Sequence, residues 1–152
     1  IRIYVKKDMK VKIDKSINKI IKEEIDYGIN KFKTYQNFGE KVYKIRENVI
    51  KNINQLKKDS KKIIGFGAPA KATTALNFFG ISDQIDFIVE DNKLKHNKFI
   101  PGVKIPIVSK SKVNGKGDTI LVLAWNFFED IKKNNKTLSD NFINIKSLEK
   151  DA

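Results

Sequence analysis

Two glycines and an alanine near the middle of the chain have the types and the spacing of a phosphate-binding turn. They are Gly65, Gly67 and Ala70, which follow the pattern G-x-G-x-x-G/A. In such a turn the first glycine allows a tight bend, the second lets the backbone approach a phosphate, and the third small residue lets a helix lie close to a strand. The pattern is weak alone, but an apolar segment precedes it and a helix-compatible segment follows it.

The start of the expected helix suits an anion. Pro69 is expected at its first position, where a missing N–H is tolerated and a fixed φ is favourable. The unpaired N–H groups and the positive dipole end of a helix start attract a phosphate or a carboxylate. Lys71 opposes that dipole unless an anion is bound. We therefore expect an anion site at residues 65–71, although a solvated lysine explains Lys71 equally well.

Other candidate side chains follow two later apolar segments. Glu90 and Asp91 end the segment 86–91, and an acid at the end of the second strand of a dinucleotide-binding fold receives a ribose hydroxyl. A simple turn at Asp91 is an equally good explanation. Trp125 and Asn126 follow the most apolar segment of the chain. His96, the only histidine, lies in an expected loop, where a surface role is the more common one and where its function is left open.

A parallel sheet would bring these side chains together. The pattern predicts helices at 70–79 and 127–134, and strands at 63–66, 86–91, 105–108, 118–125 and 142–145. Because Pro106 cannot donate to a ladder, its strand is expected at an edge or in an irregular position. The carboxyl ends of parallel strands share one edge, so the candidates are expected on one rim. The predicted fold class is α/β, a small Rossmann-like, doubly wound, mainly parallel sheet.

The first third of the chain predicts helices. Apolar residues recur at helical spacing between Asp14, a suitable N-cap, and Gly28. A second helix is expected from about Lys31 to Asp59. We expect the two to form a helical hairpin that packs within its own polypeptide, with a dimerising coiled coil as the alternative. A strand is expected at 1–5. The predicted domains are 1–60, an orphan strand with a helical linker, and 61–152, a Rossmann-like nucleotide-binding domain.

Composition excludes several classes of site and partner. The chain has 152 residues, no cysteine and one histidine, which argues against disulfides and against thiolate or histidine-rich metal sites. Its net charge is +13, but all except two of its 31 cations are lysines and most of the excess precedes residue 63. Nucleic-acid recognition draws on arginine, so we expect no nucleic-acid partner. No segment is long and apolar enough to span a membrane, and we expect a cytoplasmic protein.

Four segments in the right order resemble the C-terminal domain of the sugar C-methyltransferase family. They cover most of residues 63–128. The helix around Thr34, Tyr35 and Phe38 is also similar to the segment that connects this domain to the preceding one in that family. Residues 1–5 look like the last strand of that preceding domain. The segments are GFGAPAKATTALNFFGI at 65–81, IDFIVEDN at 85–92, FIPGVKIPIV at 99–108 and LAWNF at 123–127.

The resemblance implies a methyl transfer from S-adenosylmethionine to a ring carbon of a nucleoside-diphosphate keto-deoxysugar. Such an enzyme has an N-terminal zinc-binding region, a central S-adenosylmethionine domain and a C-terminal domain that helps to hold the sugar nucleotide. This chain lacks zinc cysteines and a second glycine motif, so we expect an isolated C-terminal domain, without catalytic residues and without a bound cofactor or metal. Its expected partners are a nucleoside-diphosphate sugar and the missing domains of the same polypeptide.

The residues expected to contact substrate or phosphate are Gly65, Gly67, Ala68, Pro69, Ala70, Lys71, Thr73, Glu90, Asp91, Trp125 and Asn126. Two other functions stay open at this point. The glycines and the following acids would also suit the NAD-binding domain of an oxidoreductase or a sensor. A nucleic-acid-binding or scaffolding module is supported by charge alone.

Overall fold

The structure is a computed structural model that describes residues 3–8, 10, 12, 14–60, 62–113 and 117–150. It divides into two compact units, Ile1–Lys41 and Val42–Ala152. A domain boundary between residues 60 and 61 stays a prediction. Within the described ranges, no helix combines the length and the apolar character that a membrane span requires.

The first unit contains helix α1 (Lys15–Tyr27) and the beginning of helix α2 (Phe32–Asp59). The side chain of Asp14 accepts a hydrogen bond from the N–H of Ser16, and hydrogen bonding to the Ser16 side chain and to this N–H lowers the pKa of Asp14. Gly28 ends α1 in the left-handed conformation, with a φ of 86°. Both helices were predicted at nearly these bounds.

Two successive helices were predicted and both are present, although no residue of α1 is buried. The chain turns at Gly28, and the Tyr35 hydroxyl donates to the Ile29 carbonyl 2.5 Å away, which joins the connection to the first turn of α2. Residues 3–5 form no strand, since strands need a ladder partner and none pairs with them among the described residues. Residues 1 and 2 lie outside the described ranges.

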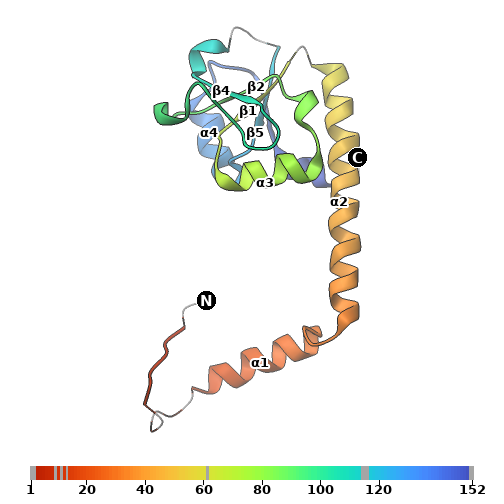
Figure 1. The fold of residues 1–152 in the computed structure, drawn as a ribbon, viewed down its shortest axis with the longest axis vertical. Helices are drawn as coiled ribbons and strands as arrows, with labels where there is room; N and C mark the ends of the chain where they lie inside the picture. Colours follow the sequence, from red (N-terminus) through yellow and green to blue (C-terminus); the bar gives the residue numbers. More distant parts are fainter. Residues whose placement is uncertain are drawn as a thin grey trace. The chain divides into compact units, whose positions relative to one another are not determined.

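The second unit is built on a six-stranded sheet in the order β3-β4-β2-β1-β5-β6 (Figure 1). All neighbours pair in parallel except β3 and β4, which are antiparallel. The described strands are β1 (Ile63–Phe66), β2 (Phe87–Val89), β3 (Lys98–Phe99), β4 (Pro106–Val108), β5 (Thr119–Val122) and β6 (Asn141–Asn144). Every residue of β1 and β5 is buried, as is typical of central parallel strands covered on both faces. The fold is therefore the mainly parallel, Rossmann-like α/β sheet that the sequence predicted.

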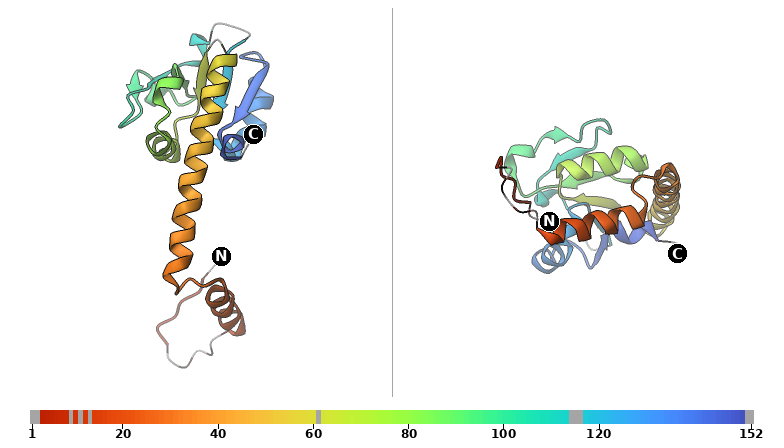
Figure 2. Two further views of the ribbon diagram at one scale, coloured as in Figure 1. Left: turned by 90° about the vertical axis from the view of Figure 1, so that its right-hand side faces the viewer. Right: turned by 90° about the horizontal axis from the view of Figure 1, so that it is seen from below.

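Helices cover both faces of this sheet (Figure 2). Helix α3 (Ala70–Phe79) packs on one face, where Ala72 and Leu76 join a core with Ile63 and Leu121. Helix α4 (Phe128–Asn134) packs on the opposite face, where its partly buried apolar side chains meet a second core that contains Ile64 and Ile120. The sheet is thus doubly wound, as predicted.

The later part of α2 packs on the sheet face that also carries α3. Val49 and Ile53 are fully buried in that core. The Asn48 side-chain amide donates to the Glu149 carbonyl, and the Asn52 amide donates to the carbonyls of Leu148 and Lys150. These bonds tie the end of the chain to α2. From Val42 onward, α2 packs within its own polypeptide, as expected.

The antiparallel strand β3 was not predicted, because two residues are too few to show alternation. It pairs with β4 at Phe99 and Pro106, so β4 does not lie at the edge of the sheet, which was one of the two positions that the proline suggested. Pro106 is tolerated because it is the first residue of its strand. The other small difference is at α3, which begins at Ala70, so Pro69 is the cap residue and not the first helical residue.

Candidate functional site

The candidate site is the edge of the sheet where the five parallel strands end, which we call the rim. Within the sheet, β2 lies next to β1 on one flank, and β5, which comes later in the chain, lies next to β1 on the other flank. The strand order therefore reverses direction at β1. Open α/β sheets bind ligands at the carboxyl ends of their strands, at such a switch point. The rim therefore has a β2 side and a β5 side, which meet at the glycine turn after β1.

Both glycines of the turn are required by the fold itself. A Cβ on Gly65 would lie 2.6 Å from Cγ1 of Ile88 and 3.1 Å from Cδ1 of Leu123. Gly67 has a φ of 86°, in the region that favours glycine, and a Cβ there would lie 3.0 Å from Cβ of Ala124. Close packing on β2 and β5 is enough to explain the glycine spacing, so the spacing alone does not imply a phosphate.

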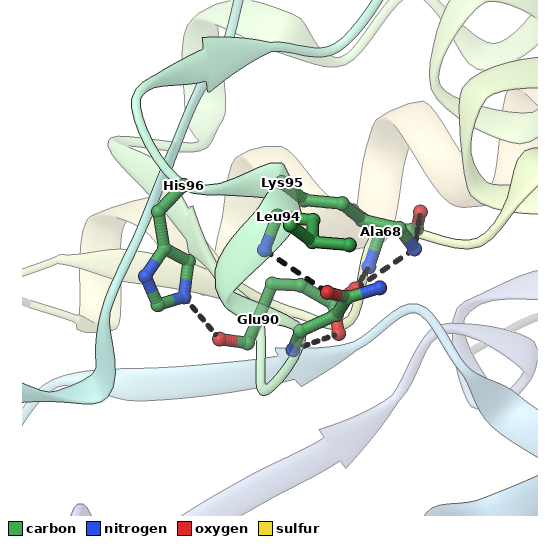
Figure 3. Close-up of polar contacts among 6 residues, drawn as sticks. Ala68, Glu90, Leu94, Lys95 and His96 are labelled. Carbon is green, nitrogen blue, oxygen red and sulfur yellow. Dashed lines mark hydrogen bonds and ion pairs between the residues drawn. The ribbon is translucent and has the colours of Figure 1, made fainter.

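On the β2 side, Glu90 turns back toward the glycine turn (Figure 3). Its Oε2 accepts from the Ala68 N–H at 2.8 Å and pairs with Nζ of Lys95 at 3.3 Å. Its Oε1 accepts from the Asn92 N–H at 3.1 Å. Lys95 Nζ also donates to the Ala68 carbonyl at 2.9 Å. These contacts form a closed set that joins the turn after β1 to the loop after β2.

The surroundings of Glu90 hold its carboxyl in the charged form. Burial opposes that charge, but the N–H groups of Ala68 and Asn92 and the ammonium of Lys95 outweigh it, so the pKa of Glu90 lies below its usual value. His96 completes the cluster, because its Nε2 lies 2.7 Å from the Glu90 carbonyl. A carbonyl only accepts, so Nε2 carries the proton, and His96 is half-buried and bonded to the backbone here.

Asp91, the other predicted acid, is exposed and faces a different partner. Its Oδ1 lies 2.6 Å from Nζ of Lys110, which also lies 5.2 Å from the ring centre of Phe66. The Asp91 side chain is 64 % exposed, so solvent screens this ion pair. Among the described residues, no three acidic or histidine side chains gather closely enough to hold a metal ion.

On the β5 side, Lys71 and Trp125 come together. Nζ of Lys71 lies 4.0 Å from the centre of the Trp125 ring, a cation–π contact between the first turn of α3 and the segment after β5. Both side chains are half-buried, and Asn126 beside them is exposed. The Asn144 amide, at the end of β6, lies 3.5 Å from the Trp125 carbonyl. This side therefore presents a cation, an indole and two amides.

The remaining predicted residues lie on the turn and on α3. Pro69 and Thr73 are half-buried, Ala70 is exposed, and the Thr73 carbonyl accepts from the Asn77 amide. The sequence reasoning missed Lys95, Lys110 and Asn144. No signal distinguished these side chains, because lysine and asparagine are abundant throughout the chain.

Comparisons with known proteins agree on one family. A family described as the C-methyltransferase C-terminal domain matches residues 1–144. The C-methyltransferase NovU of Streptomyces niveus is 30% identical over 128 residues, which are 83% of this chain and 30% of that protein. The chain thus spans less than a third of the length of this relative.

Proposed function

This chain belongs to the family of C-methyltransferase C-terminal domains, and we propose that its rim holds the nucleotide part of a nucleoside-diphosphate sugar during C-methylation. The proposed substrate is a keto-deoxysugar nucleotide. The observation that carries the proposal is the pairing of Lys71 with Trp125 beside the switch point. A cation suits a diphosphate, and an indole face suits a base or a sugar ring.

We propose that the residues of the β5 side contact different parts of the sugar nucleotide. Lys71 would attract the diphosphate, because the first turn of α3 also has the positive end of the helix dipole. Trp125 would stack on the base, and Asn126 would donate or accept at a sugar or base edge. Glycines 65 and 67, with Pro69, Ala70 and Thr73, would shape this side without direct chemistry.

The methyl donor and the catalytic groups are proposed to lie in other parts of a longer polypeptide. S-adenosylmethionine would be bound there, and this chain alone would transfer no methyl group. The support is that the chain spans 30% of its C-methyltransferase relative. Binding by the chain alone is expected to be weak, because a ligand held on one side only leaves much of its surface in water.

NAD binding is the second candidate, and the rim favours it less. In a dinucleotide-binding fold, the acid after the second strand accepts from ribose hydroxyls. Here both Glu90 oxygens already accept from the chain itself, and the Glu90 side chain is 14% exposed. Asp91 is exposed but pairs with Lys110. We therefore consider NAD a weaker candidate ligand than the sugar nucleotide.

A calorimetric titration of the 152-residue chain tests the proposal. The ligands are dTDP-glucose, NAD and S-adenosylmethionine, each at low salt. We expect a Kd for dTDP-glucose on the order of 0.1–1 mM, with weaker binding of the other two. A methyl-transfer assay with S-adenosylmethionine should give no product. Tighter binding of NAD or of S-adenosylmethionine than of dTDP-glucose would reject the assignment.

A further inference from the structure

Glu90 lies against the glycine turn at the place where a dinucleotide fold receives its ligand. We infer that Glu90 is a specificity-determining residue, a built-in anion that occupies the glycine turn and keeps the pyrophosphate of a dinucleotide out. This inference is independent of the sugar-nucleotide proposal, since it concerns the β2 side of the rim and what that side rejects.

Ala68 and Pro69, the two residues between the second glycine and α3, have no backbone donor left to offer a phosphate. The Ala68 N–H donates to Glu90 Oε2 at 2.8 Å. Pro69, the next residue, has no N–H. In a glycine turn that binds a pyrophosphate, the second glycine lets this stretch of backbone approach the ligand. Here one donor is already used and the other is missing.

The side-chain charge at the turn is also satisfied. The cation that contacts the turn is Lys95, whose Nζ is shared between Glu90 Oε2 and the Ala68 carbonyl. A second anion at the turn would face the Glu90 carboxylate at short range in a partly buried place, where repulsion between like charges is strong. The same carboxylate also has less to offer a ribose, because its other oxygen already accepts from the Asn92 N–H and its side chain is only 14% exposed.

Removing the carboxylate should therefore create an anion site. In a Glu90→Ala variant, the N–H groups of Ala68 and Asn92 and the Lys95 ammonium would lose a common acceptor (Figure 3). Two N–H groups and an ammonium that face the two oxygens of one carboxylate are donors that the oxygens of a phosphate can use instead. The turn would then resemble the phosphate-binding turns that share its glycine pattern.

The test is a titration with inorganic pyrophosphate, followed by NMR at the backbone amides of Ala68 and Asn92. In the unaltered chain we expect any saturable shift at Lys71, in the first turn of α3, and none at Ala68. In Glu90→Ala we expect saturable shifts at both amides, with pyrophosphate bound more than about tenfold tighter than in the unaltered chain. Glu90→Gln should gain less, because its amide oxygen still accepts from Ala68 while the charge of Lys95 is released.

Lys95→Met is the matched control. It loosens the same cluster but keeps the carboxylate, so it should gain no pyrophosphate binding. A saturable shift at Ala68 in the unaltered chain would overturn the inference. This measurement uses the unaltered chain alone, so it does not depend on whether a variant folds. The inference is also overturned if neither Glu90 variant gains binding, or if Lys95→Met gains as much as they do. None of these results changes the binding of dTDP-glucose expected at Lys71 and Trp125.

Discussion

The two sides of the rim use the same kinds of residues in opposite ways. On the β2 side, an acid, a lysine and backbone N–H groups bond to one another, and the Glu90 side chain is largely buried. On the β5 side, the Lys71 ammonium rests on the Trp125 ring, with an exposed amide beside it. A cation–π contact at such a place is worth about 0.5–1 kcal/mol, which a phosphate can readily displace.

The proposed division puts the ligand beside the glycine motif and not in it. The glycine turn has the clearest motif in the sequence, yet close packing explains its glycines, and the N–H of Ala68 in this turn donates to Glu90. The β5 side, where we propose the ligand, carries no phosphate-binding glycine pattern. Function is therefore better argued from which polar groups lack a partner within the chain than from the glycine pattern.

The largest effect is expected from Gly65→Ala, which separates the structural role of the turn from a binding role. The new Cβ would lie 2.6 Å from the Ile88 side chain in the centre of the sheet. We expect the free energy of unfolding to fall by about 1–3 kcal/mol in urea denaturation. The matched control is Gly39→Ala on α2, where a Cβ would meet nothing within 4 Å. That variant should be neutral or stabilising by up to about 1 kcal/mol. Equal stability of the two variants would mean that packing does not require Gly65.

The next effect concerns the β5 side. Trp125→Ala should weaken dTDP-glucose binding by about 1–3 kcal/mol, because stacking on an aromatic ring contributes that much per base. Calorimetry on the variant measures the change. Lys71→Ala should weaken binding as well, and its effect should shrink at high salt, since a phosphate–lysine contact on an open surface is screened. Lys58→Ala, on α2, removes the same charge elsewhere as a control. An unchanged Kd for Trp125→Ala would show that the ligand lies elsewhere.

The smallest effect distinguishes the β2 side by its pH dependence. Because the pKa of Glu90 is lowered in the folded chain, its contribution to stability is complete above the ordinary pKa of 4.5 and is lost as the pH falls through the lower pKa of the folded chain. Glu90→Gln should cost about 1 kcal/mol at neutral pH. This difference from the unaltered chain should shrink toward zero in acid. A difference that does not depend on pH would mean that the charge of Glu90 is not what stabilises the turn.

Much of the fold followed from the sequence because its signals are local. Continuous apolar segments marked β1 and β5, and Asp14 and Gly28 marked the ends of α1. The pairing of Pro106 with a two-residue strand could not be predicted, since it depends on a neighbour that has no pattern of its own. The exposure of α1 could not be predicted either, because periodicity shows that a face is apolar but not what covers it.

The candidate site was predictable in position but not in its internal contacts. The carboxyl ends of parallel strands must meet at one edge, so the rim followed from the order of elements. The direction of the Glu90 side chain did not follow, because it depends on Lys95, one of many lysines. The contact between Lys71 and Trp125 joins residues that are far apart in the sequence, and no spacing rule relates them.

The most direct test of the division between the two sides is a map of amide shifts during a titration with dTDP-glucose. We expect the largest saturable shifts at Lys71, Trp125 and Asn126, with little change at Ala68, Glu90 and Lys95. Shifts centred on Ala68 and Glu90, with Trp125 unaffected, would contradict this division, because the ligand would then bind on the β2 side, where Glu90 already bonds to the Ala68 N–H.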